Sequence, residues 1–174
     1  MKKGGIGGAN TKTGLVYESK VDFLTFISKQ KNYSVKDIHI FYNGEEVAIS
    51  FKKYGLYKYL TSKGVNYKKY ISKRLIPDDA IYVIANNHFY IFEVKSQRGD
   101  GSVDEKLQTC DFKIKQYRKL LSCLNVEVEF IFILGDWFKQ PRYKDTLDYI
   151  ISISGCSYYF NYLPLQKIGL PVPK

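Results

Sequence analysis

Histidine and cysteine are scarce in this chain of 174 residues, which has two histidines and three cysteines. His39 and His88 are far apart, and Cys110, Cys123 and Cys156 form no C-x-x-C motif, so a zinc site is not expected. Neither histidine has the motif context of a base that activates a serine or cysteine nucleophile. An odd number of cysteines in apolar segments predicts reduced core residues in a protein that stays inside the cell.

Glycine motifs that bind nucleotides are also missing, as are long apolar runs. The glycine-rich start contains no G-x-x-x-x-G-K-[S/T], and no G-x-G-x-x-G lies between a strand and a helix, so no nucleotide cofactor is expected. Residues 1–6 lack the apolar region of a signal peptide, and no apolar stretch reaches the ~18 residues that a membrane span needs. These absences predict a soluble, cytoplasmic protein with no membrane partner.

Negative charge is in the minority. The chain has 27 Lys and Arg against 17 Asp and Glu, a net charge of +10, which favours a polyanionic partner. Lysine supplies most of this charge, because the only arginines are Arg74, Arg98, Arg118 and Arg142. Arginine is the better reader of guanine. A compositional bias of the source would give the same excess, so charge alone does not assign nucleic-acid binding.

Two apolar runs separated by Asn86-Asn87 predict an antiparallel hairpin, since both runs are rich in β-branched and aromatic residues. A two- or four-residue loop centred on these asparagines would place Asp78 opposite Lys95. Asp78, Glu93 and Lys95 would then share one face of the hairpin, and Asp79 would point to the other face. A three-residue loop would exchange the two aspartates.

Two carboxylates and an ammonium group on one sheet face suit metal-assisted attack on a phosphodiester. Mg²⁺ prefers oxygen ligands and takes one or two carboxylates together with phosphate oxygens. The ion polarises the phosphoryl oxygen and lowers the pKa of a bound water, while a lysine can position that water or stabilise developing charge. An ordinary hairpin with an exposed Glu–Lys pair would carry the same residues. The apolar run that delivers Glu93 and Lys95 favours a site, because it predicts a central strand, where unpaired charge is costly.

The pattern Pro77-Asp78…Glu93-Val94-Lys95 resembles the PD-(D/E)XK nuclease superfamily, and Gln97 fits the E-x-K-x-Q extension seen in part of it. Residues 7–18 and 101–109 look like type II restriction endonucleases of that superfamily. The resemblance covers roughly residues 4–135, and we find no match after it.

The resemblance implies Mg²⁺-dependent cleavage of double-stranded DNA at a short specific sequence. Asp78, Glu93 and the backbone carbonyl of Val94 would hold the metal, Lys95 would lie beside the attacking water, and Gln97 would contact phosphate or support the metal ligands. The alternatives are a structure-specific endonuclease, such as a junction resolvase or repair nickase, and a non-catalytic DNA-binding protein on the same fold. Because one core supplies one active site and a duplex has two strands, a homodimer is the simplest arrangement.

The order of elements predicts an α/β fold (α+β, with a mixed sheet) in a single domain of residues 1–174. A flexible glycine-rich arm over residues 1–14 precedes an amphipathic helix over residues 15–30. The resemblance implies an acidic residue near the metal on this helix, and Glu18 is the candidate, although an exposed surface Glu18 fits the pattern equally well. Asn43-Gly44 between two apolar runs favours another hairpin.

After the catalytic hairpin, Ser102 and Glu105 form a capping box, which starts a helix at Val103 whose buried face continues to Leu124. A strand over residues 126–134, a short helix over about 143–153 and a final strand over 156–163 follow. This order is consistent with the α-βββ-α-β core that the resemblance implies.

A basic, tyrosine-rich segment forms an insertion before the catalytic hairpin. Basic residues interleaved with tyrosines suit phosphate contacts with aromatic support, although a solvated helix with inward-facing tyrosines would have the same pattern. The candidate DNA contacts are Lys52, Lys53, Lys58, Lys68, Lys69, Lys73 and Arg74, with Arg98 after the hairpin.

Overall fold

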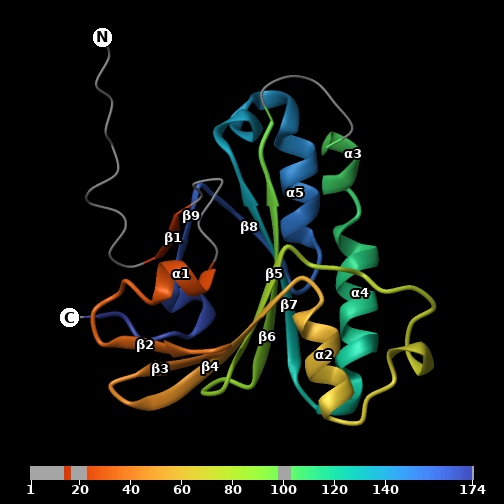
Figure 1. Ribbon diagram of the computed structural model, residues 1–174. Helices are drawn as coiled ribbons and strands as arrows, with labels where there is room; N and C mark the ends of the chain where they lie inside the picture. The colour runs from red at the N-terminus through yellow and green to blue at the C-terminus, as the bar shows by residue number, and fades with distance from the viewer. Residues whose placement is uncertain (1–13, 17–22, 98–102, 174) are drawn as a thin grey trace.

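A seven-stranded mixed β-sheet forms the centre of the protein in a computed structural model that describes residues 14–16, 23–97 and 103–173 (Figure 1). Strands β2 to β6 pair antiparallel in succession, and β6, β7 and β8 are parallel. In sheet order the strands are β2 (Tyr33–Lys36), β3 (His39–Tyr42), β4 (Glu45–Lys52), β5 (Asp79–Val83), β6 (His88–Lys95), β7 (Glu127–Leu134) and β8 (Cys156–Phe160).

Helices cover the two faces of this sheet unequally (Figure 1). One face packs against α2 (Gly55–Ser62), α3 (Val103–Leu107), α4 (Cys110–Leu121) and α5 (Lys144–Ser152). The other packs against α1 (Phe23–Ile27), strand β9 (Tyr162–Pro164) and the short helix η5 (Leu165–Ile168). Because parallel neighbours need a crossover, α4 connects β6 to β7 and α5 connects β7 to β8.

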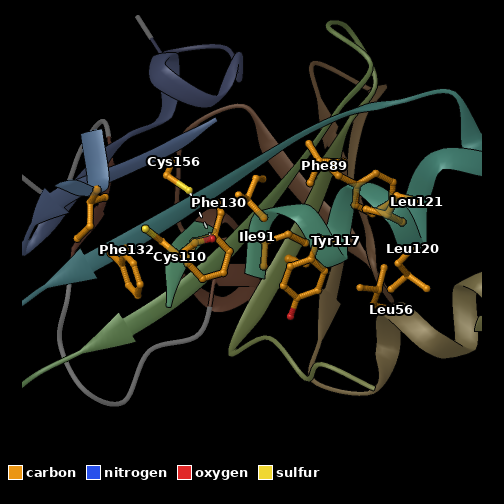
Figure 2. Packing of buried hydrophobic residues seen from close by; sticks show 14 of the residues in the cluster. Leu56, Phe89, Ile91, Cys110, Tyr117, Leu120, Leu121, Phe130, Phe132 and Cys156 are labelled. Carbon is orange, nitrogen blue, oxygen red and sulfur yellow. Dashed lines mark hydrogen bonds between the residues drawn. The ribbon is translucent and has the colours of Figure 1, made fainter. Parts of the chain in front are cut away.

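The central strands β6 and β7 are buried on both faces. Phe89 and Ile91 of β6 pack into the layer under α4, whereas Tyr90 and Phe92 pack into the layer under α1. Figure 2 shows the first layer, in which Tyr117 of α4 lies against the sheet. The prediction of a central strand leading to Glu93 and Lys95 is therefore confirmed.

The first predicted hairpin is also confirmed. β3 and β4 are joined at Asn43 and Gly44, whose φ angles of 50° and 86° belong to the left-handed region that a tight two-residue hairpin turn requires. Strand β7 and helix α5 agree with the predicted strand 126–134 and helix 143–153. No helix in the described ranges is long and apolar enough to cross a membrane.

Two predictions near the chain ends are wrong. Residues 14–16 form strand β1 (Gly14–Val16), which pairs with β9, so the arm does not extend through Gly14 and no helix begins at residue 15. The described helix in this region is α1 alone, and residues 1–13 and 17–22 lie outside the described ranges. The predicted last strand is divided into β8 and β9 at Asn161, which has a φ of 54°.

The predicted long helix is likewise divided, into α3 and α4. At the break, the Thr109 hydroxyl donates a hydrogen bond to the Lys106 carbonyl at 2.7 Å, a contact that competes with the helical backbone. The cysteines are free, and Cys110 and Cys156 are buried as predicted, but Cys123 is exposed. The interpretation of Cys123 as a core residue was wrong, because it lies in the 3₁₀ turn η2 (Ser122–Leu124) that ends α4.

Candidate active site

The register of β5 and β6 decides which carboxylates meet. Asp79 pairs with Phe92, so the hairpin loop is residues 84–87 and Asp78 comes level with Glu93. The predicted pairing of Asp78 with Lys95 is wrong by two residues. Two residues are a full period of a strand, so the prediction that Asp78, Glu93 and Lys95 share one face is still confirmed.

Lys95 lies between the two carboxylates. Its Nζ atom is 2.9 Å from Glu93 Oε1 and 3.8 Å from Asp78 Oδ2. The backbone N–H of Val94 donates a hydrogen bond to Asp78 Oδ2 at 2.9 Å. Asp78 directly precedes β5 in the sequence, and this hydrogen bond holds its carboxylate against β6.

Asp79 belongs to the opposite face, as expected for a loop with an even number of residues. Its carboxylate accepts hydrogen bonds from the Ser50 hydroxyl and the Phe23 backbone N–H, each at 3.4 Å, and from its own neighbour Ala80 at 3.0 Å. These contacts tie β5 to β4 and α1. Asp79 therefore has a structural role, and Asp78 is the aspartate available to the site.

Lys113 of α4 is a member of the site that the sequence analysis missed. Its Nζ atom lies 2.8 Å from Glu93 Oε1 and 5.6 Å from the centre of the Phe130 ring. The available signal was its place on α4, three residues after Cys110 and four before Tyr117, both of which are buried. Glu93 is thus held by one lysine from its own strand and one from the covering helix.

The two lysines keep Glu93 ionised. The side chain of Glu93 is only 14% exposed, and this burial raises its pKa. The hydrogen bond and charge of Lys113, with the charge of Lys95, outweigh burial, so the pKa of Glu93 is lower than its ordinary value of 4.5. The site therefore presents a carboxylate at neutral pH, although it is partly buried.

Tyr117 is one turn of α4 beyond Lys113 and stays protonated. Burial, followed by the negative charges of Glu93 and Asp78 and the neighbouring Tyr57, raises the pKa of its phenol well above the ordinary value of 10. The Tyr117 phenol is therefore uncharged at neutral pH.

Gln97 lies two residues beyond Lys95, and its side-chain amide is unusual. Both Nε2 and Oε1 are buried, and neither has a hydrogen-bond partner among the residues that the structure describes. Unpaired buried amide atoms are costly, so they mark a place where a water or ligand atom belongs. Two further residues predicted from the sequence, Glu18 for catalysis and Arg98 for DNA binding, lie outside the described residues.

Asp78 and Glu93 have donor chemistry that suits a divalent cation. Within the described residues, the contacts of Asp78 fall on Oδ2 and those of Glu93 fall on Oε1, so Oδ1 and Oε2 are the oxygens that could bind a cation. The described residues contain no group of three or more His, Cys, Asp or Glu side chains that could hold a metal ion. A cation here would need further ligands from the Val94 carbonyl, water or substrate, as Mg²⁺ commonly has.

The position of the site in the sheet also suits ligand binding. Lys95 is the last residue of β6, and its carbonyl accepts a hydrogen bond from Gly135 N–H, directly after β7, at 2.9 Å. The site therefore lies at the carboxyl ends of the parallel strands, the edge of open α/β sheets at which ligands bind.

The predicted DNA-contacting residues that the structure describes lie on two surfaces, the insertion and, for Lys52, the face of the sheet opposite to Glu93. Those of the insertion are all exposed: Lys53, Lys58, Lys68, Lys69, Lys73 and Arg74. Lys52 is exposed as well, but it shares a face of β4 with Ser50, which bonds Asp79, so it lies on the sheet face opposite to Glu93. The structure does not bring Lys52 to the site.

Arg74 of the insertion lies against two tyrosine rings. Its guanidinium lies 4.6 Å from the ring centre of Tyr67 and 5.4 Å from that of Tyr57. The Tyr57 hydroxyl donates to the Leu75 carbonyl and accepts from the Leu75 N–H, both at 2.9 Å. Because Arg74 is four residues before Asp78, its backbone lies within about 14 Å of the site.

No protein-family model, no curated protein and no solved structure matches this chain in searches of all three kinds. A function for the protein must therefore be inferred from its own residues.

Proposed function

We propose that this protein is a Mg²⁺-dependent endonuclease that hydrolyses double-stranded DNA at a short specific sequence, as type II restriction endonucleases do. The observation that carries the proposal is the meeting of Asp78, Glu93 and Lys95 at the carboxyl end of a central strand, with Lys95 Nζ 2.9 Å from Glu93 and 3.8 Å from Asp78. Paired carboxylates next to an ammonium group are suited to phosphodiester hydrolysis.

The elements around the site support a restriction-endonuclease-like core. β4, β5 and β6 are successive antiparallel strands, α4 follows, and β7 is parallel to β6. This is the βββ-α-β part of the α-βββ-α-β order implied by the resemblance to PD-(D/E)XK nucleases, and α1 precedes it in the chain. In this proposal α2 and η1 (Tyr67–Lys69) form the basic insertion before the catalytic hairpin.

Each residue has a role that follows from its chemistry. Asp78, Glu93 and the Val94 carbonyl would hold Mg²⁺, which supplies a polarised phosphoryl oxygen and a more acidic bound water. Lys95 can donate a hydrogen bond to a water or phosphate oxygen and stabilise the negative charge that develops during attack. The unpaired amide of Gln97 can donate and accept at once, which suits an ordered water or a phosphate oxygen.

Incubation with supercoiled plasmid DNA and Mg²⁺ tests the proposal directly. We expect discrete linear fragments whose sequenced ends share one short sequence, with no cleavage when the divalent cation is chelated. Cleavage of branched DNA alone would instead identify a structure-specific endonuclease. Tight DNA binding without cleavage would identify a non-catalytic DNA-binding protein.

The time course of the same reaction tests the assembly. A homodimer on a two-fold symmetric site cuts both strands together, so supercoiled DNA should pass to linear form with little nicked circle. A large transient pool of nicked circles, together with a 1:1 complex in sedimentation, would contradict the dimer.

Arg74→Ala should weaken DNA binding, since the guanidinium is exposed and fixed beside two tyrosines near the site. Loss of one phosphate contact should lower the slope of log affinity against log salt by about 0.9. Fluorescence anisotropy over a salt series measures both quantities. Lys36→Ala is the matched control, because Lys36 is exposed on the outermost strand β2 and should leave affinity and slope unchanged. Equal slopes in the two variants would remove Arg74 from the interface.

A further inference from the structure

We infer that Lys113 holds Glu93 while no divalent cation is bound, competes with the cation for this carboxylate, and contacts the substrate phosphate once the cation has displaced it. The inference rests on the proposed function. It extends that function, because Lys113 lies on α4 and is not part of the E-x-K pattern on β6.

Two ammonium groups share a single oxygen of Glu93. Lys113 Nζ is 2.8 Å and Lys95 Nζ is 2.9 Å from Oε1. Together they place two positive charges at this carboxylate, the same charge that one divalent cation would bring. Glu93 is 14% exposed and Lys113 is 20% exposed, so water screens their attraction less than it screens a surface ion pair.

Lys113 is distinct from its neighbour Lys115 on the same helix. Lys115 is 69% exposed and pairs with Asp111 on the outer side of α4. Lys113 instead lies beside the buried residues Ile114 and Tyr117 and reaches inward over the Phe130 ring. An ammonium group in such a place is costly without a partner, and Lys113 forms an ion pair with Glu93.

A cation bound to Glu93 would repel Lys113 and remove the need for it as a counter-charge. The lysine side chain is a flexible four-carbon stem with three donors, so its ammonium group can turn away from Glu93 without moving α4. A substrate phosphate held beside this carboxylate would then offer the freed ammonium group a charge-assisted hydrogen bond. Lys113 thereby balances the charge of Glu93 in the cation-free site and donates to the substrate phosphate when the cation is bound.

Calorimetric titration of Mn²⁺ into the protein without DNA tests the competition. Lys113→Met keeps the unbranched apolar stem and removes the charge, so the cation should bind more tightly, by roughly fivefold or more. Cleavage at saturating cation should nevertheless fall by at least ~10-fold, because the phosphate loses a supporting donor. Lys115→Met makes the same change in net charge two residues away and should leave both quantities as in the wild type. Lys113→Arg, which keeps the charge, should retain wild-type cation affinity.

Equal or weaker cation binding by Lys113→Met would overturn the inference, because a lysine that competes with the cation for Glu93 must weaken cation binding while it is present. If thermal melting shows that Lys113→Met does not fold, Lys113→Gln removes the same charge and carries the same expectation. A folded wild-type protein that binds no Mn²⁺ would overturn the proposed function, and the inference with it. Cation binding by the wild type with no difference in the variants would overturn the inference alone.

Discussion

Asp78→Asn and Glu93→Gln should each reduce DNA cleavage in Mg²⁺ by ~10³-fold or more, because a metal ion contributes several kcal/mol of charge stabilisation that is lost with its ligand. Both substitutions keep the size of the side chain. DNA binding measured in Ca²⁺ should be at least as tight as in the wild type, since fewer negative charges do not weaken attraction to phosphate. Lys95→Met should also be inactive. Initial rates on plasmid DNA and anisotropy with a labelled duplex measure the two effects.

Asp79→Asn is the matched control for Asp78→Asn. It makes the same chemical change one residue along the chain, but on the face that bonds Ser50 and α1. We expect Asp79→Asn to lower stability and leave the rate of the folded enzyme close to that of the wild type. An active Asp78→Asn together with an inactive, folded Asp79→Asn would show that the site lies on the other face of the sheet.

Much of the architecture around this site is predictable because it depends on local patterns. The runs that become β6 and β7 are apolar on both faces, which indicates central strands, and Asn43-Gly44 has the residues of a tight hairpin turn. The common face of Asp78, Glu93 and Lys95 follows from the alternation of side chains in a strand. An error of two residues in the position of the turn leaves this face unchanged, because two residues are one full period of a strand.

The register itself was mispredicted because the turn is not polar throughout. Ile84 looks like a strand residue, yet it lies in the loop and is 40% exposed. The asparagines occupy only the second half of that loop, and Asn87 has a φ of 56°. A prediction that centres the turn on polar residues therefore shifts the pairing by two.

Other features depend on contacts between distant segments. β1 forms by pairing with β9, in which Gly14 lies opposite Pro164. These two residues are 150 positions apart in the sequence (164 − 14), and no local sequence pattern predicts such a pairing. Lys113 belongs to the same class. Its helix is predictable, but its ion pair with Glu93 depends on how α4 lies over β6. From the sequence alone, a lysine on a helix is expected to be exposed to solvent, so Lys113 would not be predicted to lie in the site.

Removal of both site lysines, in Lys95→Met/Lys113→Met, should lower the free energy of unfolding by about 3 kcal/mol at neutral pH without divalent cation, because it leaves a partly buried carboxylate with no counter-charge. Each single substitution leaves one ammonium group on Glu93, so the double variant should lose more than the sum of the two. Urea unfolding followed by the fluorescence of Trp137, the single tryptophan, measures this. Addition of Glu93→Gln to the double variant should restore most of the loss.

The pH dependence of stability should reverse sign in the same double variant. In the wild type the lysines hold the pKa of Glu93 below 4.5, so the stability that Glu93 contributes is present above about pH 4.5 and is lost as the pH falls through the folded pKa. Without the lysines only burial remains, and it raises the pKa of Glu93 above 4.5. The folded double variant then binds the proton more tightly than the unfolded chain, so its stability should rise on acidification from pH 7 to 5. Comparison with the variant that also carries Glu93→Gln removes the contribution of all other groups. Parallel profiles with and without Glu93 would mean that the two lysines do not control this carboxylate.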